Sequence, residues 1–409
     1  YLNKNKMKIE VDNDNEKKEK YYNVENSLNS FLIIDKEEED KNNEDYGFDE
    51  LSFKDIYKSN SLFEHVIEHI NLYFSKTDSK NEIIYKNLKK ITEFINQNRF
   101  TEEILEIILL NGIPNNIPCL RPLIWKCFMG YFPPNDLSKW KTITINSYKI
   151  YKSIKKKYSY YPSNIQDQTE QKIVIQLTKD LKRTRRNVPF FQNKSGSKKH
   201  PEETNDDVIK RMLFYFAKEH SLSYVQGMNE IIALIYYIFA NDDNPFLRRF
   251  VESDTYFCFR ILVKEIEPIF RMNDIDYSDL FITKQIEQIN KILEKIEPEI
   301  LNYFKEIEFS INCFVMRWVM VLFAQEFKID VAVNFWDRMF TQKNKTNFIC
   351  FISVAILQIN KDKIMMKEIE DIADWTKEMG NNISKLDIND IIKKAFEVKR
   401  KYKELTGTK

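Results

Sequence analysis

The segment SYVQGMNEIIALIYYIFA, residues 223–240, joins a polar turn directly to a strongly apolar run. The apolar side chains of that run recur every three or four positions, which is the spacing of one face of a buried α-helix. These residues are Met228, Ile231, Ile232, Ile235 and Phe239. Gly227 stands where the helix begins and is the only glycine between positions 197 and 379. Because glycine permits a positive φ or a close backbone approach, we expect a tight turn before the helix.

Helical spacing continues over the rest of the chain. EEILEIILLNG, residues 102–112, carries an apolar stripe that stops at Gly112, a residue typical of helix C-termini. A further stripe consists of Ile209, Met212, Leu213 and Phe216. SINCFVMRWVMVLFAQEF, residues 310–327, is apolar nearly all round and predicts one central buried helix. Since no segment from 51 to 400 sustains period-two alternation, the sequence predicts an all-α body.

Composition excludes several classes of protein. The 409 residues include only seven glycines, and no two lie within ten positions of each other, so there is no G-x-G-x-x-G or Walker A loop. Lysine and arginine total 63 against 62 acidic residues, and this net charge of +1 gives no field for attracting nucleic acid. Five cysteines without a C-x-x-C pair favour a reducing compartment. No apolar run reaches ~18 residues, so we expect no transmembrane segment. Together with the reduced cysteines this favours a cytoplasmic protein, and the balanced charge predicts no nucleic-acid partner.

The N-terminal part of the chain differs from the remainder in character. Residues 1–50 are polar and charged and include the run DKEEED, which predicts a disordered acidic tail. From residue 51 onward the pattern is helical, and residues 51–110 predict an N-terminal helical extension.

Two polar stretches interrupt the helical body. SYKIYKSIKKKYSYY, residues 147–161, is basic and rich in tyrosine. It is either a solvated helix face or a surface that contacts acidic lipid or protein. NKSGSKKHPEETNDD, residues 193–207, lacks apolar residues and predicts a loop, after which Asp206 or Asp207 can cap the next helix.

The sequence HVIEH at residues 65–69 matches the H-x-x-E-H pattern of one zinc peptidase class. Its two histidines lie four residues apart and would share one face of a helix. A catalytic zinc needs a third protein ligand from farther along the chain, yet residues 137–166 contain no Asp or Glu. We therefore favour an ordinary amphipathic helix and expect no metal site.

The run QLTKDLKRTRRNVPFF, residues 176–191, places several cations close together. Asp180 precedes Arg183 by three residues, which puts the carboxylate and the guanidinium on the same side of a helix. An arginine oriented in this way can offer its planar fork of donors to phosphate oxygens. The alternative is a simple basic cluster on the surface.

The turn SYVQGMNEI, residues 223–231, contains a second polar candidate. The amide of Gln226 can accept a hydrogen bond from water and donate one to an oxygen at the same time. The alternative is a turn that only caps the following helix.

Four motifs occur in order along the chain: LRPLIWK from residue 120, DLKRT from 180, YVQGM from 224 and NFWDRMF from 334. Together they resemble the TBC (Tre-2/Bub2/Cdc16) family of GTPase-activating proteins for Rab GTPases, and most of all its member-13 type. That family carries an I-x-x-D-x-x-R motif, which here begins with Leu177 and ends with Arg183. Its second motif, Y-x-Q-G, is intact in this chain. The resemblance covers about residues 100–375.

The resemblance implies a TBC fold of two packed helical subdomains, at residues 111–260 and 261–400, with both motifs in the first. It also implies that Arg183 acts as an arginine finger and Gln226 as a glutamine finger, two side chains that enter the active site of the GTPase. Asp180 is then expected to orient Arg183.

The resemblance also suggests supporting roles. Arg121 and Trp125 are expected to brace the arginine segment from beneath. The residues expected to fix the glutamine turn are Tyr224, Gly227 and Asn229. Arg185 and Arg186, which follow the finger arginine, are expected to contact the partner. Two residues of NFWDRMF, Trp336 and Asp337, are expected to be structural.

The implied function is the acceleration of GTP hydrolysis in trans on a GTP-bound Rab-family GTPase. GTP and Mg²⁺ then belong to the partner, so the chain is expected to hold no cofactor and to catalyse no reaction alone. We expect a monomer that reaches endomembranes through the Rab. The alternative is a non-catalytic helical scaffold that binds a Rab through the same surface, which would be favoured if either finger were missing.

Overall fold

The computed structural model describes residue 72 and most of the chain from residue 102 to residue 407. The described ranges beyond residue 72 are 102–115, 119–133, 136, 138–158, 160, 167–197, 200–220, 222–242, 247–270, 278–368, 371–372, 374–375 and 388–407. The predicted acidic tail, most of the predicted helical extension and the HVIEH sequence lie outside them.

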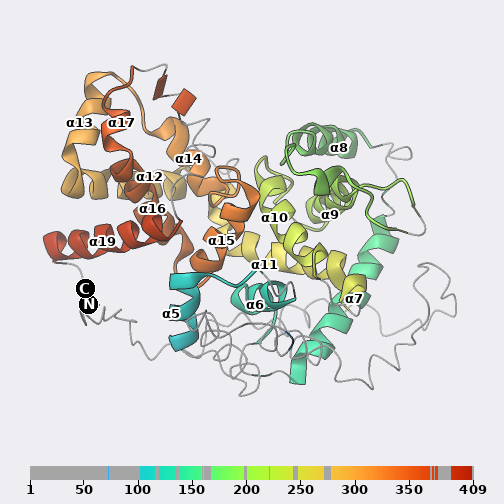
Figure 1. Ribbon diagram of the computed structural model, residues 1–409. Helices are drawn as coiled ribbons and strands as arrows, with labels where there is room; N and C mark the ends of the chain where they lie inside the picture. The colour runs from blue at the N-terminus through green and yellow to red at the C-terminus, as the bar shows by residue number, and fades with distance from the viewer. Residues whose placement is uncertain are drawn as a thin grey trace, which may run out of the picture. The chain divides into compact units, whose positions relative to one another are not determined.

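Up to residue 270, the described ranges contain seven α-helices and two short 3₁₀ helices (Figure 1). The α-helices are α5 (Glu102–Asn111), α6 (Leu120–Phe128), α7 (Ser138–Tyr158), α8 (Gln168–Leu181), α9 (Asn205–Glu219), α10 (Met228–Ala240) and α11 (Val251–Phe270). The 3₁₀ helices are η3 (Pro189–Gln192) and η4 (Arg248–Phe250). The expected boundary between residues 260 and 261 falls inside α11.

The described residues after 270 form further helices. They are α12 (Ser278–Ile296), α13 (Pro298–Glu306), α14 (Asn312–Met320), α15 (Ile329–Met339), α16 (Lys345–Ile359), α17 (Lys361–Ile364) and α19 (Ile388–Thr406). Within the described ranges the one β pairing is an isolated antiparallel bridge between Lys194 and Thr204. The prediction of an all-α protein is confirmed. None of the helices in the described part of the chain is long and apolar enough to cross a membrane.

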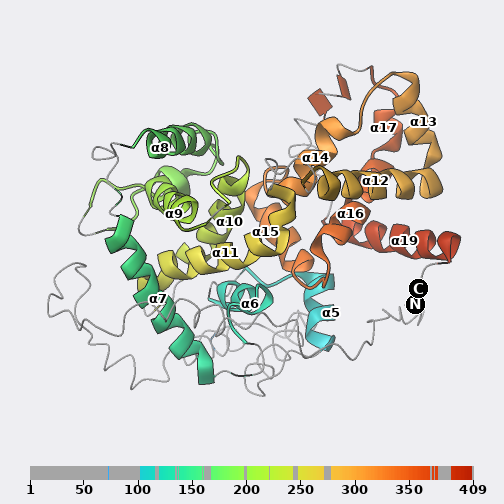
Figure 2. The ribbon, with the colours of Figure 1, turned by 180° about the vertical axis from the view of Figure 1, so that it is seen from behind.

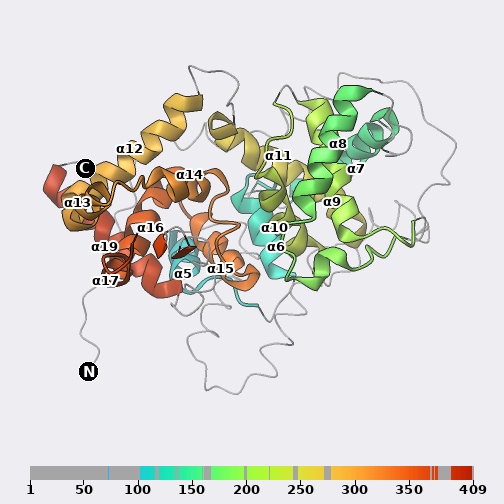
Figure 3. The ribbon, with the colours of Figure 1, turned by 90° about the horizontal axis from the view of Figure 1, so that it is seen from above.

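In the first half of the described chain, α10 lies among α6, α8, α9 and α11. α10 contacts α11 and α9, and α9 in turn contacts α8, as the views from behind and from above also show (Figures 2 and 3). In the second half, α16 contacts both α12 and α19. The residues of the two predicted stripes are at most 2% exposed: Ile209, Met212, Leu213, Phe216, Met228, Ile231, Ile232, Ile235 and Phe239. Their burial supplies the main stabilisation of α9 and α10, because amphipathic helices gain stability chiefly from packing.

Helix ends show one confirmed and one wrong prediction. Gly112 ends α5 with a φ of 70°, and its amide donates to the Ile108 carbonyl at 2.8 Å, as predicted. The N-cap of α9 is Thr204 rather than Asp206 or Asp207. The Asp207 carboxylate reaches back to the Thr204 amide at 3.0 Å while the Thr204 hydroxyl accepts from the Asp207 amide. Two free amides are thereby satisfied, so the threonine is the better cap.

The predicted single helix over residues 310–327 is wrong. α14 ends at Met320, and a series of turns follows in which Leu322 and Phe323 have φ values of 51° and 58°. The Leu322 carbonyl accepts a hydrogen bond from Trp336 Nε1 at 3.0 Å. Both turn residues are fully buried, so an apolar pattern alone could not separate this turn from a helix.

Candidate functional site

The segment that carries Arg183 is positioned by α8. The helix begins where the Asp167 side chain accepts from the Glu170 amide at 2.8 Å, and it packs against α9. Its inward face includes Leu177 and Leu181, which are 0% and 2% exposed. Arg183 follows the last turn of α8, and its side chain is 64% exposed.

Asp180, a buried acid in the last turn of α8, holds Arg183 in place. Its Oδ1 accepts from Arg183 Nη2 at 2.5 Å. Its Oδ2 accepts from Gln176 Nε2 at 2.9 Å and lies 2.8 Å from the Tyr224 hydroxyl, which can donate to it. Since Asp180 is only 2% exposed, the pair consists of a buried anion and a cation at the surface.

The turn before α10 is tied to the same acid. The Tyr224 hydroxyl also lies 2.9 Å from Asn229 Oδ1, which accepts from the Gly227 amide at 3.0 Å. Asn229 Nδ2 donates to the Thr184 hydroxyl at 2.8 Å, and that hydroxyl donates to the Asp180 carbonyl at 2.9 Å. Burial, together with the Asp180 carboxylate, raises the pKa of Tyr224 well above its ordinary value, so the hydroxyl keeps its proton.

Gly227 has the positive φ expected of it. Its φ is 107°, and a Cβ added there would lie 3.0 Å from Val321 Cγ1. The residue occupies the N-cap position of α10 without a side-chain capping hydrogen bond. Gln226, immediately before it, is exposed. The turn therefore presents an amide side chain at the surface while its backbone lies against the segment after α14.

The structure corrects the expectation for Arg185. Its φ is 47° and its side chain is 7% exposed, so it points into the protein and not toward a partner. Its Nη1 donates to the Phe327 carbonyl at 2.6 Å, and its Nε lies 3.5 Å from a carboxylate oxygen of Glu230. Of the two arginines expected to contact a partner, only Arg186 is exposed.

A cluster of buried charges surrounds Arg185. Glu230, in the first turn of α10, has its pKa raised to about 7 by burial, and the Arg185 guanidinium opposes this rise. Glu326 contributes to the same rise and itself pairs with Arg317, whose Nη2 lies 2.9 Å from Glu326 Oε2. The cluster connects the segment after α8 with α10 and with the turns after α14.

Arg121 and Trp125 have a different role from the one expected of them. The hydrogen bonds of their side chains go to Asp337 of α15 and to the Ile113 carbonyl, and none goes to the Arg183 segment. Arg121 Nε and Trp125 Nε1 lie 3.0 Å and 2.8 Å from Asp337 Oδ1. Trp125 also packs against Trp336, with ring centroids 5.7 Å apart. These residues fasten α6 to α15.

Other residues of the site were not among those predicted. Gln176 and Thr184 bind the Asp180 residue directly, and Thr184 could have been recognised because it belongs to the DLKRT motif. Phe327 contacts Arg185 from 142 positions away, and nothing local in the sequence signals such a contact.

The family model for the Rab-GTPase-TBC domain matches residues 118–365, which is more than half of the chain. The chain therefore belongs to the Rab-GTPase-TBC domain family. TBC1 domain family member 13 from Homo sapiens is 32% identical over 164 residues, which cover 40% of this chain and 41% of the relative. GTPase-activating protein GYP1 from Saccharomyces cerevisiae is 23% identical over 282 residues, covering 64% of this chain and 40% of the relative. The chain thus spans about 40% of the length of these curated relatives.

Two solved structures have the same fold. The crystal structure of the Ypt/Rab-GAP domain of Gyp1p gives a TM-score of 0.63 at 20% identity and covers 78% of this chain and 99% of that one. The Chlamydomonas flagellar RabGAP TBC domain gives 0.53 at 16% identity, covering 83% and 96%. The predicted TBC-domain fold is confirmed.

Proposed function

We propose that this chain accelerates GTP hydrolysis by a Rab-family GTPase and supplies Arg183 and Gln226 in trans to the active site of that partner. The observation that carries the proposal is the double role of Asp180. This buried carboxylate binds Arg183 directly, and it binds the Gln226 turn through Tyr224. Membership of the Rab-GTPase-TBC domain family supports the class of partner.

Arg183 has the chemistry of an arginine finger. A guanidinium matches phosphate oxygens with its fork of donors and stays charged at any physiological pH. A Ras-class GTPase hydrolyses GTP slowly because its site lacks charge that stabilises the transferring phosphoryl group, and a finger in trans adds about 10³–10⁵ in rate. At ~1.36 kcal/mol per decade this is about 4–7 kcal/mol of barrier. The exposure of the Arg183 side chain leaves it free to enter a partner.

Gln226 has the chemistry needed to orient the attacking water. Its amide oxygen can accept from the water while its NH₂ group donates to a second oxygen. The backbone of its turn is fixed by the Gly227 conformation and by the hydrogen bond to Asn229. A side chain presented from such a rigid turn is already near its working position, so little free energy is spent on ordering it during the reaction.

In this proposal the chain catalyses no reaction alone. GTP and Mg²⁺ belong to the Rab, and the chain contributes side chains only. It works as a monomer and meets membranes through the membrane-attached Rab.

The proposal is tested by measuring phosphate release from a panel of GTP-loaded Rab proteins. The wild-type chain is compared with the double variant Arg183→Ala/Gln226→Ala, and binding to each Rab is measured in parallel. We expect the wild type to accelerate one or more Rabs and the double variant to bind them without acceleration. Binding of a Rab by the wild type without acceleration would instead establish the non-catalytic scaffold, and no binding at all would reject the partner class.

A further inference from the structure

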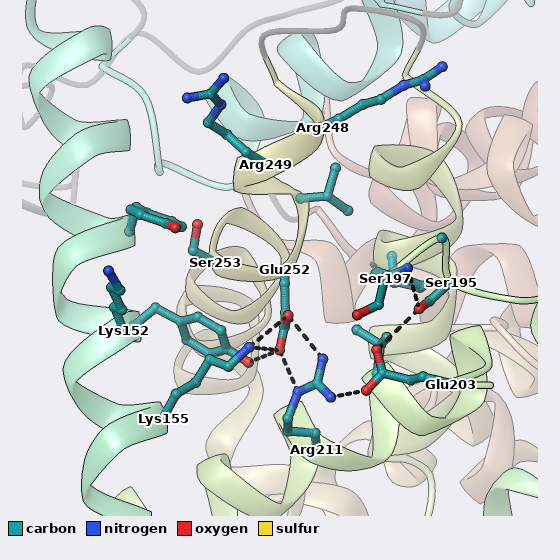
Figure 4. A pocket seen from close by; sticks show the side chains of 16 residues that line it. Lys152, Lys155, Ser195, Ser197, Glu203, Arg211, Arg248, Arg249, Glu252 and Ser253 are labelled. Carbon is teal, nitrogen blue, oxygen red and sulfur yellow. Dashed lines mark hydrogen bonds and ion pairs between the residues drawn. The ribbon is translucent and has the colours of Figure 1, made fainter. Parts of the chain in front are cut away.

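A pocket of about 160 Å³ lies between α7, the loop that precedes α9 and the start of α11 (Figure 4). None of the residues assigned above to the Arg183 and Gln226 site lines it. Tyr148 of α7 packs edge-on against Phe250 of η4, with ring centroids 5.4 Å apart. The α7 residues at the pocket belong to the basic stretch at 147–161, for which the sequence allows contact with an anionic partner.

One group of charges in the pocket is internally compensated. The Glu252 carboxylate lies 2.8 Å from Arg211 Nε, and it also accepts from the Tyr151 hydroxyl at 2.7 Å. Lys155 Nζ lies 3.3 Å from the same carboxylate, and Glu203 pairs with the other side of Arg211. Burial would raise the pKa of Glu252, but Arg211 and Lys155 lower it to about 2. These acids are therefore occupied by partners of their own.

Three cations in the pocket have no such partner. Within the described ranges Lys152, Arg248 and Arg249 form no ion pair, and no dashed line reaches them in Figure 4. Arg249 Nε is buried and has no hydrogen-bond acceptor in that part of the chain. Because an unpaired buried donor is costly, such a group indicates an acceptor that the protein itself does not supply.

The surface of α7 extends this positive region. The helix contains seven lysines and no acidic residue. Lys149, Lys152 and Lys156 are exposed and lie three and four positions apart, so they share one face of the helix. Lys152 is therefore a member of both the exposed lysine face and the pocket.

We propose that this pocket binds a polyol that carries two or more phosphate groups, either as the head group of a phosphorylated inositol lipid or as the free head group. A phosphate monoester carries about −1.5 to −2 charges at pH 7, so two such groups match three unpaired cations. Consecutive arginines offer forked donors to their oxygens. The Ser197 hydroxyl, which accepts from the His200 amide at 3.1 Å, retains its own proton for a further hydrogen bond.

The test uses the full chain and two sources of the same phosphates. Titration calorimetry measures binding of soluble inositol trisphosphate. Cosedimentation measures binding to phosphatidylcholine vesicles that carry phosphatidylinositol bisphosphate, beside vesicles that carry phosphatidylserine at equal total charge. The pocket variant is Lys152→Gln/Arg248→Gln/Arg249→Gln. The control variant, Lys291→Gln/Lys393→Gln/Lys401→Gln, removes the same charge from exposed positions of α12 and α19, which do not line the pocket.

At ~1 kcal/mol per cation near a phosphorylated surface, the pocket variant should bind roughly 100-fold more weakly, and the control variant should bind like the wild type. Pocket-dependent binding of the soluble compound alone identifies a soluble ligand, whereas pocket-dependent binding of the bisphosphate vesicles alone identifies the lipid. Binding of both identifies the phosphates as the recognised feature. The proposal is overturned if the wild type binds neither probe, if phosphatidylserine vesicles bind equally well, or if the control variant loses as much affinity as the pocket variant.

A single variant guards against misfolding of the triple one. Lys152 is exposed on α7, so Lys152→Glu should fold normally, and thermal denaturation verifies this. We expect it to weaken binding roughly 10-fold or more, since it removes one attraction and adds one repulsion. The measurements require no GTPase, so their failure would leave the proposed activation of Rab hydrolysis untouched.

Discussion

Asp180 and Asp337 are two buried aspartates whose arginine partners differ in exposure. Asp180 is 2% exposed and Asp337 is 0% exposed. Arg121, the partner of Asp337, has a side chain that is 8% exposed and donates from both Nε and Nη2 to buried acceptors. The side chain of Arg183, the partner of Asp180, is 64% exposed. The two acids therefore share an environment while their cations do not.

This difference separates an ion pair that holds the fold from one that presents a cation. Removing one member of a buried pair leaves an uncompensated charge in the interior, which is strongly destabilising. Loss of the exposed Arg183 also leaves a buried carboxylate, but Asp180 still accepts from Gln176 Nε2 and lies 2.8 Å from the Tyr224 hydroxyl, so we expect a smaller loss of stability. The exposure of the arginine, more than the spacing of the motif, therefore indicates which pair belongs to a surface that acts on a partner.

The largest expected effect is that of Arg183→Ala on hydrolysis by the partner Rab. We expect the accelerated rate of GTP hydrolysis to fall about 10³–10⁵-fold, because the charge that stabilises the phosphoryl group is lost. The free energy of unfolding should fall by less than the ~3–5 kcal/mol that breaking a fully buried pair costs, because Gln176 and Tyr224 remain beside the Asp180 carboxylate. Phosphate release and thermal denaturation measure the two quantities, with Lys172→Ala, which removes an exposed cation near the start of α8, as the matched control. A large loss of stability would show that Asp180 and Arg183 form a structural pair after all.

Asp337→Ala should have the opposite pair of effects: a large loss of folding stability and little loss of acceleration. It leaves Arg121 buried without its carboxylate, and it removes the acceptor of the Trp125 indole. We expect a loss of about 3–5 kcal/mol in the free energy of unfolding, measured by denaturant titration. Acceleration per folded molecule should remain. The control is Asp390→Ala, whose side chain is 65% exposed. Equal effects of the two substitutions would contradict the structural role.

The buried acid Glu230 should make the free energy of unfolding depend on pH. Its pKa of about 7 in the folded protein lies above its ordinary value of 4.5, so the folded state binds the proton more tightly. The stabilisation of the folded state by this protonation is complete below about pH 4.5 and is lost as the pH rises to about 7. It amounts to roughly 3 kcal/mol, at ~1.36 kcal/mol per pH unit. Glu230→Gln mimics the protonated side chain and should remove this dependence.

The measurement for Glu230 is the free energy of unfolding of wild type minus that of Glu230→Gln, followed across this pH range. Other groups also titrate there, including His220 with a pKa of about 4 and Asp206 with a pKa of about 7, and their contributions cancel in the difference. A difference that is independent of pH would show that Glu230 stays ionised beside Arg185.

Gly227→Ala should lower stability less than Asp337→Ala does. A positive φ costs a residue with a Cβ about 1–2 kcal/mol, and here the added atom would also press on Val321 at 3.0 Å. Gly196→Ala is the matched control, because its φ is 78° and no atom lies within 4 Å of the added Cβ. We expect both to lower the melting temperature, and only Gly227→Ala to reduce phosphate release. Normal activity of Gly227→Ala would remove the turn from the proposed mechanism.

The parts of the fold that depend on nearby residues could be predicted from the sequence. The buried stripes of α9 and α10 follow from helical spacing. The contact between Asp180, in the last turn of α8, and Arg183, just after that helix, follows from their separation of three residues. The break after α14 could not be predicted, because its turn residues are as apolar as those of a helix. Its position depends on the Trp336 indole, which binds the Leu322 carbonyl.

Contacts between distant parts of the chain explain the errors at the site. The 216 positions between Arg121 and Asp337 leave no local pattern that pairs them. The direction of Arg185 is set by its own positive φ and by the Phe327 carbonyl, neither of which a cluster of cations reveals. Sequence motifs therefore indicated which segments matter, while packing decided which side chain of each segment reaches the surface.

The central claim is that this chain supplies both catalytic side chains to its partner. The most direct test is phosphate release from a responsive Rab whose own catalytic glutamine has been replaced by leucine, measured with the wild-type chain and with Gln226→Ala. If Gln226 orients the attacking water, the wild-type chain should still accelerate this Rab variant, and Gln226→Ala should not. Loss of acceleration with the wild-type chain, together with normal activity of Gln226→Ala on the unaltered Rab, would show that the water is positioned by the GTPase itself.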